Sequence, residues 1–273
     1  MLRLIVRRLL FIVVGAALLW SASGLLARWV AGRLLFRHNP PTYAVSGNIR
    51  LIDTGEGDRI ALAYLPNPSA RFTILFFHGN GSQLGKDLPF LADLRNEGFA
   101  VAAIDYRGYG ASEGHSSVSA ISADARAAIR WLGEAQGTQA GQVIVLGYSM
   151  GNGPAVQVAA EYPVAGLVIE AGFASAFSVK SNLGARLLAP FDVFPSERLL
   201  RRVKCPVLII HGTQDGTVPF EQGLRLYAAA PGPKRLIAIP GGDHHIVSSM
   251  GPAFWREIKK FATGLQHGIE RRD

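Results

Sequence analysis

Short apolar runs recur along most of the chain, and they restrict its fold more than any other feature. Examples are TILFF, VIVL and VLII, which are apolar almost throughout. Strands that are covered on both faces have this pattern, which is typical of parallel sheets. We therefore expect eight strands, at Ile49–Ile52, Ile60–Leu65, Thr73–Phe77, Ala100–Ile104, Val143–Leu146, Gly166–Ile169, Val207–Ile210 and Arg235–Ile239.

Helical patterns fall between most of these runs, near Ser82–Asn96, Ser119–Ala135, Gly151–Glu161, Phe220–Ala229 and Pro252–Gly264. The alternation predicts an α/β fold with a mostly parallel eight-stranded sheet and helices on both faces. We expect residues 41–273 to form this domain. The stretch 173–202 interrupts the alternation, and we interpret it as a small cap over the carboxyl ends of the strands, where open α/β sheets bind ligands.

The pentapeptide Gly147-Tyr148-Ser149-Met150-Gly151 lies between an apolar run and a helical pattern. In this strand–turn–helix setting, G-x-S-x-G is typical of a nucleophilic serine. The turn strains the serine backbone, and the flanking glycines remove side chains that would collide there. The following helix directs its amino terminus, with its free N–H groups, at the site. We expect Ser149 to be the nucleophile; the alternative is a glycine-rich turn with an incidental serine.

A serine hydroxyl needs a base, and the base needs an orienting acid. Asp215 follows the apolar run VLII, and His244 and His245 follow the next run. Residues just past parallel strands lie at the same edge of the sheet, which favours Asp215 as the acid and His244 as the base. Glu170, after the strand at 166–169, is the rival acid.

His245 is the rival base, because either neighbour in the histidine pair can turn toward the serine. His78 is a poor candidate for the base, since it precedes the serine in the chain. It begins the loop His78-Gly79-Asn80-Gly81, which follows the strand at 73–77. Two backbone N–H groups are needed to hold an oxyanion, and we expect them from Asn80 and Met150. The alternative is that this loop is only a turn.

The amino-terminal segment is strongly basic, whereas the rest of the chain is nearly neutral. Residues 1–40 contain six arginines and no acid, which leaves 22 basic and 20 acidic residues in the remainder. A nucleic-acid-binding domain more often has a basic stripe on its own surface, so no nucleic acid is expected as a partner. The single cysteine, Cys205, excludes an internal disulfide and is expected to be a packed core thiol. The spacing of Cys and His residues does not indicate a metal site.

Nineteen uncharged residues, Leu9–Ala27, lie between Arg8 and Arg28. A helix of that length spans about 28 Å, close to the apolar thickness of a bilayer. We interpret residues 1–40 as a single-pass membrane anchor with its juxtamembrane segment. The alternative is a secretory signal cleaved near Ser21–Ser23, although the apolar run exceeds a usual signal core. Arginines on both sides leave the orientation in the membrane undecided.

Five motifs are HGN at 78–80, DYRGYGASEG at 105–114, GYSMG at 147–151, HGTQDGTVP at 211–219 and GGDHH at 241–245. In this order they resemble the α/β-hydrolase superfamily, and more narrowly its Bem46-type branch with the α/β-hydrolase-domain proteins 13 and 17. The resemblance covers about residues 45–265 and implies Ser149, Asp215 and His244 as the triad. A membrane segment is common in this branch. One departure is His245, where relatives often have asparagine.

The expected function is a serine hydrolase that cleaves carboxylic ester or thioester bonds through an acyl-enzyme intermediate, without cofactor or metal. A small-molecule or lipid-like acyl ester is the expected substrate. The alternatives are a membrane-tethered binding protein without activity and a peptidase or amidase of the same fold. A peptidase usually has a further amino-terminal domain, for which about 45 residues are too few.

The sequence also suggests roles for Arg107 and for the apolar residues of the stretch 173–202. Arg107 is expected to pair with an acid and brace the loop beside the site. Apolar residues of the stretch 173–202 are interpreted either as an acyl pocket or as ordinary core. They are Phe173, Phe177, Leu187, Leu188, Phe191 and Phe194.

Overall fold

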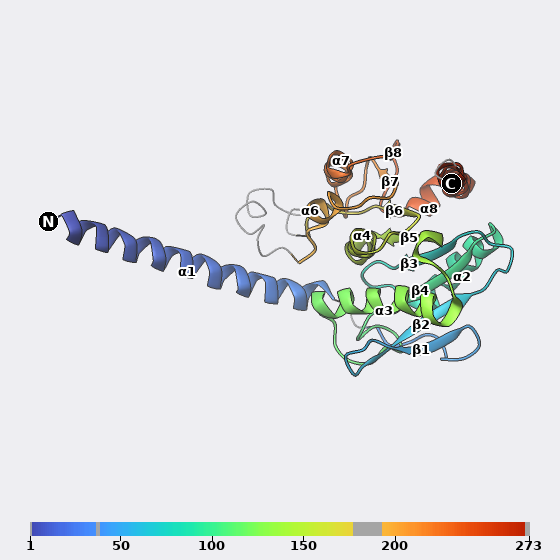
Figure 1. Ribbon diagram of the computed structural model, residues 1–273, viewed down its shortest axis with the longest axis horizontal. Helices are drawn as coiled ribbons and strands as arrows, with labels where there is room; N and C mark the ends of the chain where they lie inside the picture. The colour runs from blue at the N-terminus through green and yellow to red at the C-terminus, as the bar shows by residue number, and fades with distance from the viewer. Residues whose placement is uncertain (1, 37–38, 177–192, 271–273) are drawn as a thin grey trace.

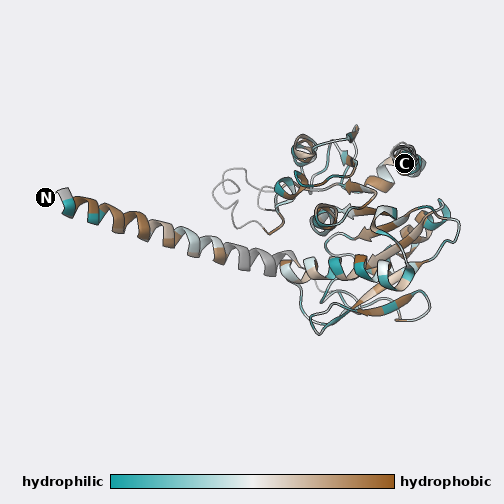
Figure 2. Ribbon diagram, in the orientation of Figure 1, coloured by the Kyte–Doolittle hydropathy of each residue, from teal (hydrophilic) through white to brown (hydrophobic). Residues whose placement is uncertain are grey.

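The computed structural model describes residues 2–36, 39–176 and 193–270. Helix α1 (Leu2–Leu35) extends away from the folded domain, as Figure 1 shows. Its first half is predominantly apolar (Figure 2), and large side chains such as Leu10, Phe11 and Leu19 are exposed. Ile5–Leu26 is the one helical stretch of the described chain long and apolar enough to span a membrane, a test that a signal sequence near the amino terminus also passes.

An eight-stranded sheet forms the centre of the domain, in the order β1-β2-β4-β3-β5-β6-β7-β8. The strands are β1 (Ile49–Asp53), β2 (Arg59–Leu65), β3 (Thr73–Phe77), β4 (Ala100–Ile104), β5 (Val143–Tyr148), β6 (Gly166–Glu170), β7 (Val207–Gly212) and β8 (Lys234–Ile239). The pairs β1–β2 and β2–β4 are antiparallel, and all others are parallel. The carboxyl ends of β3 to β8 therefore lie at one edge of the sheet.

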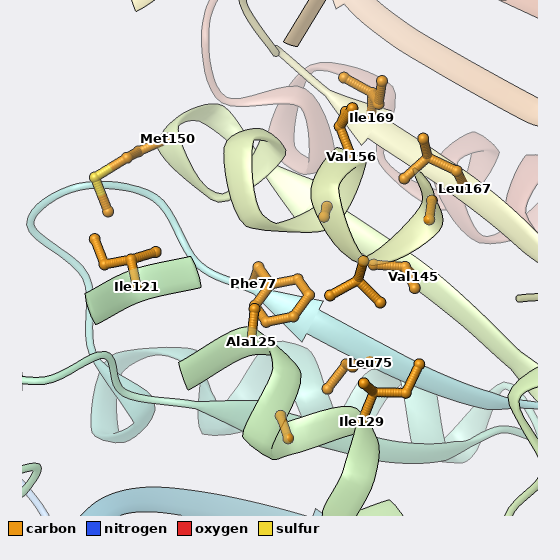
Figure 3. Close-up of a cluster of buried hydrophobic side chains, with 14 of the residues drawn as sticks. Leu75, Phe77, Ile121, Ala125, Ile129, Val145, Met150, Val156, Leu167 and Ile169 are labelled. Atoms are coloured by element: carbon orange, nitrogen blue, oxygen red, sulfur yellow. The ribbon is translucent and has the colours of Figure 1, made fainter. Parts of the chain in front are cut away.

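Helices cover both faces of the sheet. One face packs against α3 (Val118–Gln136), α4 (Asn152–Glu161), α6 (Ser196–Leu200) and α7 (Phe220–Ala229). The other packs against α2 (Leu84–Asn96), α8 (Ile246–Met250) and α9 (Pro252–Glu270). Figure 3 shows the first of these layers, with Ala125 and Ile129 of α3 beside side chains of β3 and β5 and Ile121 beside Met150.

Local sequence explains where α3 begins and ends. The Ser117 side chain accepts a hydrogen bond from the Ala120 N–H, and Gly137 adopts a left-handed conformation after the last turn. The buried residues between them recur every three or four positions, so one stripe of the helix faces the sheet. Strands β3 and β4 are buried along their whole length, which explains why their sequences are apolar except for Thr73.

The predicted α/β architecture is confirmed, and each predicted strand is present to within two residues. The short helices α6 and α8 were not predicted, because five residues are too few to show a helical period. Part of the expected cap, residues 177–192, lies outside the described residues, and with it Phe177, Leu187, Leu188 and Phe191. Phe173 and Phe194, at the two ends of that stretch, are buried in the main core.

Candidate active site

The turn after β5 holds Ser149 in a strained conformation. Its φ is 51°, one of two positive values among non-glycine residues of the described chain. A β-carbon on Gly147 would lie 2.6 Å from the Gly151 carbonyl oxygen, and one on Gly151 would collide with the Phe77 backbone. The two glycines are therefore required by backbone crowding. A short 3-10 turn, η2 (Ser149–Gly151), leads directly into α4, so Ser149 lies at the amino terminus of a helical segment.

Three side chains from the carboxyl ends of β5, β7 and β8 meet at this turn. His244 Nε2 lies 3.0 Å from Ser149 Oγ, and His244 Nδ1 lies 2.7 Å from Asp215 Oδ2. Both distances to the His244 ring are those of hydrogen bonds, although Asp215 and Ser149 lie 29 and 95 positions away from it in the chain. Groups arranged in this way can supply a nucleophile, a base and an orienting acid.

The loop after β7 fixes the Asp215 carboxylate. Its Oδ1 accepts hydrogen bonds from the backbone N–H groups of Thr217 and Val218, both at 2.8 Å. Burial raises the pKa of Asp215, but the hydrogen bonds from His244 and these N–H groups outweigh it and leave the pKa below its usual value. The ring of His211 supports the same loop, because its Nε2 donates to the Val218 carbonyl at 2.8 Å.

The loop after β3 lies against Ser149. A β-carbon on Gly79 would be 3.0 Å from the Tyr148 ring and 3.4 Å from Ser149 Cβ, so a larger residue would crowd the site. Asn80 follows directly, and its side-chain oxygen accepts a hydrogen bond from the Tyr109 hydroxyl at 2.8 Å. Met150, the residue after the serine, is buried. The two expected oxyanion donors thus belong to segments that pack together around Ser149.

His78 is buried beneath this loop between two acceptors. Its Nδ1 lies 2.8 Å from the Gly79 carbonyl oxygen, and its Nε2 makes an ion-pair contact of 3.2 Å with Asp105 Oδ1, at an angle outside that of a hydrogen bond. Burial by itself lowers the pKa of His78, but Asp105, Asp87 and the carbonyl group outweigh it, and the pKa lies above its usual value. Because neither acceptor carries a hydrogen, the geometry favours a doubly protonated ring.

The rival residues occupy other positions. His245 is exposed, and its backbone N–H donates to Asp243 Oδ1. Glu170 is buried at the end of β6, where burial raises its pKa to about 8, whereas Asp215 is the carboxylate that contacts His244. The expected pairing of Arg107 is present, because its Nε donates to Asp124 Oδ1 at 2.8 Å. Cys205 is buried, which raises the pKa of its thiol to about 12.

Three supporting residues were missed by the sequence analysis. The Tyr148 ring packs 5.3 Å from the His244 ring, and its hydroxyl donates to the His244 carbonyl oxygen. The residue before a nucleophile in G-x-S-x-G is variable by definition, so the motif carries no signal for it. His211 stands four residues before Asp215 and could have been noticed by that spacing. Tyr43, which contacts Asp105, lies in a segment without any recognisable pattern.

No metal centre is formed by the described residues, in which no three His, Cys, Asp or Glu side chains gather around one point. A family model described as serine aminopeptidase, S33, matches residues 68–192. An esterase of Pyrococcus furiosus superposes with a TM-score of 0.66 at 19% identity, over 84% of this chain and 98% of that one. The superposition shows an α/β-hydrolase fold, and the family match over residues 68–192 agrees with it.

Two relatives narrow this class. The α/β-hydrolase domain-containing protein aho-3 of Caenorhabditis elegans is 32% identical over 85% of this chain and 70% of its own length. Human α/β-hydrolase domain-containing protein 17B is 32% identical over 77% of this chain and 73% of its own. The chain therefore belongs to the α/β-hydrolase family, in the branch of the domain-containing proteins 17.

Proposed function

We propose that the chain is a serine esterase that cleaves carboxylic ester or thioester bonds through Ser149, His244 and Asp215. The main support for this proposal is that the His244 ring is within hydrogen-bond distance of both other residues. Its Nε2 lies 3.0 Å from Ser149 Oγ, and its Nδ1 lies 2.7 Å from Asp215 Oδ2. Membership of a hydrolase family supports it independently.

The reaction follows from the roles of these groups. As Ser149 Oγ attacks the acyl carbon, His244 Nε2 takes its proton and becomes an imidazolium, which the Asp215 carboxylate stabilises. His244 then gives that proton to the departing alcohol or thiol, and the acyl group remains on Ser149. A water molecule, deprotonated by the same ring, releases the acid in the second half of the cycle. No cofactor takes part in these steps.

The negative charge of each tetrahedral intermediate is held by the backbone N–H groups of Asn80 and Met150. The support is the packing of the loop His78–Gly81 against Ser149 and the place of Met150 in the first turn after it. The helical segment that begins at Ser149 adds a favourable field at its amino terminus. Donors that are already in position cost no reorganisation when the charge develops.

Esters and thioesters are preferred over amides because alcohols and thiols leave more readily than amines. The substrate is a small-molecule or lipid-like acyl ester. The description of the matched family names an aminopeptidase, which makes amide cleavage the second candidate. In either case α1 is proposed to anchor residues 41–273 to a membrane through its apolar stretch Ile5–Leu26.

A fluorophosphonate probe tests the proposal on the full chain in detergent. The probe should label the wild type and spare Ser149→Ala. The matched control is Ser69→Ala, which changes an exposed turn serine and should leave labelling intact. Para-nitrophenyl esters of increasing acyl length, compared with the corresponding anilides, then separate esterase from amidase activity. Equal labelling of wild type and Ser149→Ala, or of neither, would refute the proposal.

A second measurement tests the anchor. The mass of the chain purified from membranes distinguishes an intact amino terminus from one cleaved near Ser21–Ser23. We expect the intact mass in the membrane fraction after a high-salt wash. A shortened chain in the soluble fraction would instead support a signal sequence.

A further inference from the structure

The segment that follows α1 is hydrogen-bonded to the loop beside the nucleophile. We call Asn39–Tyr43 the strap. Asn39 Nδ2 donates to the Gly81 carbonyl oxygen at 2.9 Å. The buried Gln83 side chain holds the strap at two further points, donating to the Pro40 carbonyl at 2.8 Å and accepting from the Thr42 N–H at 2.9 Å. These contacts span more than forty positions in the sequence, so they are tertiary contacts and not a local turn.

Tyr43 makes the deepest contact of the strap. Its hydroxyl donates to Asp105 Oδ2 at 2.5 Å and accepts from the Ala111 N–H at 3.0 Å. Gly110 makes this approach possible, since a β-carbon there would collide with both Asp105 Oδ2 and the Tyr43 hydroxyl. Burial and the neighbouring Asp105 carboxylate raise the pKa of Tyr43, so the hydroxyl keeps its proton and acts as a donor.

Asp105 connects the Tyr43 hydroxyl to the loop His78–Gly81, which we call the oxyanion loop. The carboxylate is fully buried, and its Oδ1 accepts from the Leu84 N–H at 2.8 Å, at the start of α2, and contacts His78 Nε2 at 3.2 Å. His78 in turn holds the Gly79 carbonyl oxygen. A peptide group is planar, so fixing the Gly79 carbonyl also fixes the direction of the Asn80 N–H on the other side of the same bond.

We propose that Tyr43 and the strap position the oxyanion loop, so that the segment joining the apolar helix to the domain helps to set the direction of the Asn80 N–H. This inference rests on the proposed function. Removing the Tyr43 hydroxyl leaves Asp105 Oδ2 without its donor inside the protein, and a buried carboxylate in that situation shifts its neighbours or rotates. Either response moves His78 and the peptide that it holds.

A strap that only added stability would behave differently. It would change the amount of folded protein and the unfolding temperature, but the folded molecules would turn over substrate at the wild-type rate. A positioning strap lowers kcat of the folded molecules. It leaves KM nearly unchanged, because the oxyanion forms only in the transition state.

The test compares Tyr43→Phe with Tyr227→Phe in the full chain. The ring of Tyr227, on α7, lies under the ammonium group of Lys234, at the start of β8, and phenylalanine preserves that contact. Hydrolysis of a para-nitrophenyl ester, normalised to fluorophosphonate-titrated sites, gives kcat and KM. Hydrogen exchange of the peptide covering residues 79–85 reports the loop directly. Asn39→Ala, a change at the partly exposed end of the strap, repeats the test without touching the buried carboxylate.

We expect kcat of Tyr43→Phe to fall about tenfold, well short of the 10²–10³ of a deleted donor, with KM within about twofold. Exchange in residues 79–85 should accelerate in Tyr43→Phe and, less strongly, in Asn39→Ala, but not in Tyr227→Phe. An unchanged kcat, or unchanged exchange in both strap variants, overturns the proposal. If the wild type hydrolyses no ester and binds no probe, the proposed function fails, and the exchange result alone decides whether the strap holds the loop.

Discussion

Two histidine–aspartate pairs stand at the same edge of the sheet, and they differ in what the second ring nitrogen faces. His244 has Asp215 on Nδ1 and the Ser149 hydroxyl on Nε2. His78 has Asp105 on Nε2 and the Gly79 carbonyl oxygen on Nδ1. A hydroxyl can give up a proton, whereas a carbonyl can only accept a hydrogen bond. The first ring can therefore exchange a proton, and the second can only keep its own.

The two histidine side chains also differ in how far they are buried. The His244 side chain is 14% exposed and that of His78 is 1% exposed. The rings of Tyr106 and Tyr109 enclose His78, with centroids 4.5 and 5.5 Å from its own. The same two residue types thus give a reactive pair and a fixed one. Each pair contains an aspartate carboxylate, so the carboxylate does not distinguish the two. The role of each pair is set by the other neighbours of its histidine.

Removing each histidine should separate the two roles most clearly. We expect His244→Ala to lower kcat by about 10⁴-fold or more, because the base is lost, with little change in the folding of the chain. His78→Ala should lower kcat by about 10–100-fold, since it loosens one oxyanion donor, and should also lower the unfolding temperature. Steady-state ester hydrolysis and thermal unfolding measure both. Equal losses of kcat would show that the pairs do not differ as described.

Replacing the two aspartates should affect catalytic activity and folding stability to different degrees. Asp215→Asn is expected to lower kcat by about 10⁴-fold, because asparagine no longer holds the ring in the reactive tautomer. Asp105→Asn should lower kcat far less, by about 10-fold through the loosened oxyanion loop, and should in addition lower the free energy of unfolding by about 3 kcal/mol, since it breaks a buried ion pair and a helix contact. Urea unfolding and kinetics on the same preparations test this. An Asp105→Asn variant of wild-type stability would contradict the account of the buried pair.

The two pairs should respond to pH in opposite directions. The pKa of His78 is raised on folding, so its stabilising effect is complete below the pKa of an unfolded histidine and is lost as pH rises through the folded value. The pKa of Asp215 is lowered, so its effect is present above the usual aspartate pKa and is lost as pH falls. In urea unfolding, His78→Gln should differ from wild type most near pH ~5.5, and Asp215→Asn most near pH ~7. Parallel pH profiles would refute this.

The smallest expected effect is that of replacing Glu170, the buried acid at the end of β6. Burial, reinforced by Asp87, raises its pKa to about 8. A raised carboxyl pKa means that folding becomes less favourable as pH rises from the usual glutamate value toward 8. Glu170→Gln should therefore unfold at a higher temperature than wild type near pH ~9 and at the same temperature near pH ~4, by about 2–4 °C for each kcal/mol recovered. A lower unfolding temperature at pH ~9 would assign Glu170 a charged structural role.

The sequence predicts the sheet well because the inner parallel strands, β3 to β7, are almost completely buried, so their composition alone is informative. Ser149, Asp215 and His244 are also predictable, since each follows a strand of the parallel part of the sheet and parallel strands end at one edge. The choice between His244 and His245 is harder. Both follow β8, and only the turn through Gly241 and Gly242 decides which ring faces the serine.

The supporting contacts have no comparable signal. Tyr43, Gln83 and Asp105 come from a linker, a helix end and a strand end, and their spacing follows no period. Their interaction depends on how the strap crosses the molecule, which is a property of the tertiary structure. The close approach at Gly110 is similar, because a glycine in a loop rich in glycine gives no indication that an aspartate and a tyrosine meet there.

Phe36, the last described residue before the strap, is buried and packs edge-on against Phe194. Any processing event at Ser21–Ser23 would thus cut the apolar helix well upstream of the point where the chain is fastened to the domain. The liberated protein would keep both Phe36 and the strap. Soluble and bilayer-bound forms would then have the same intrinsic turnover on a freely dissolved substrate and would differ only in the substrates that they can reach.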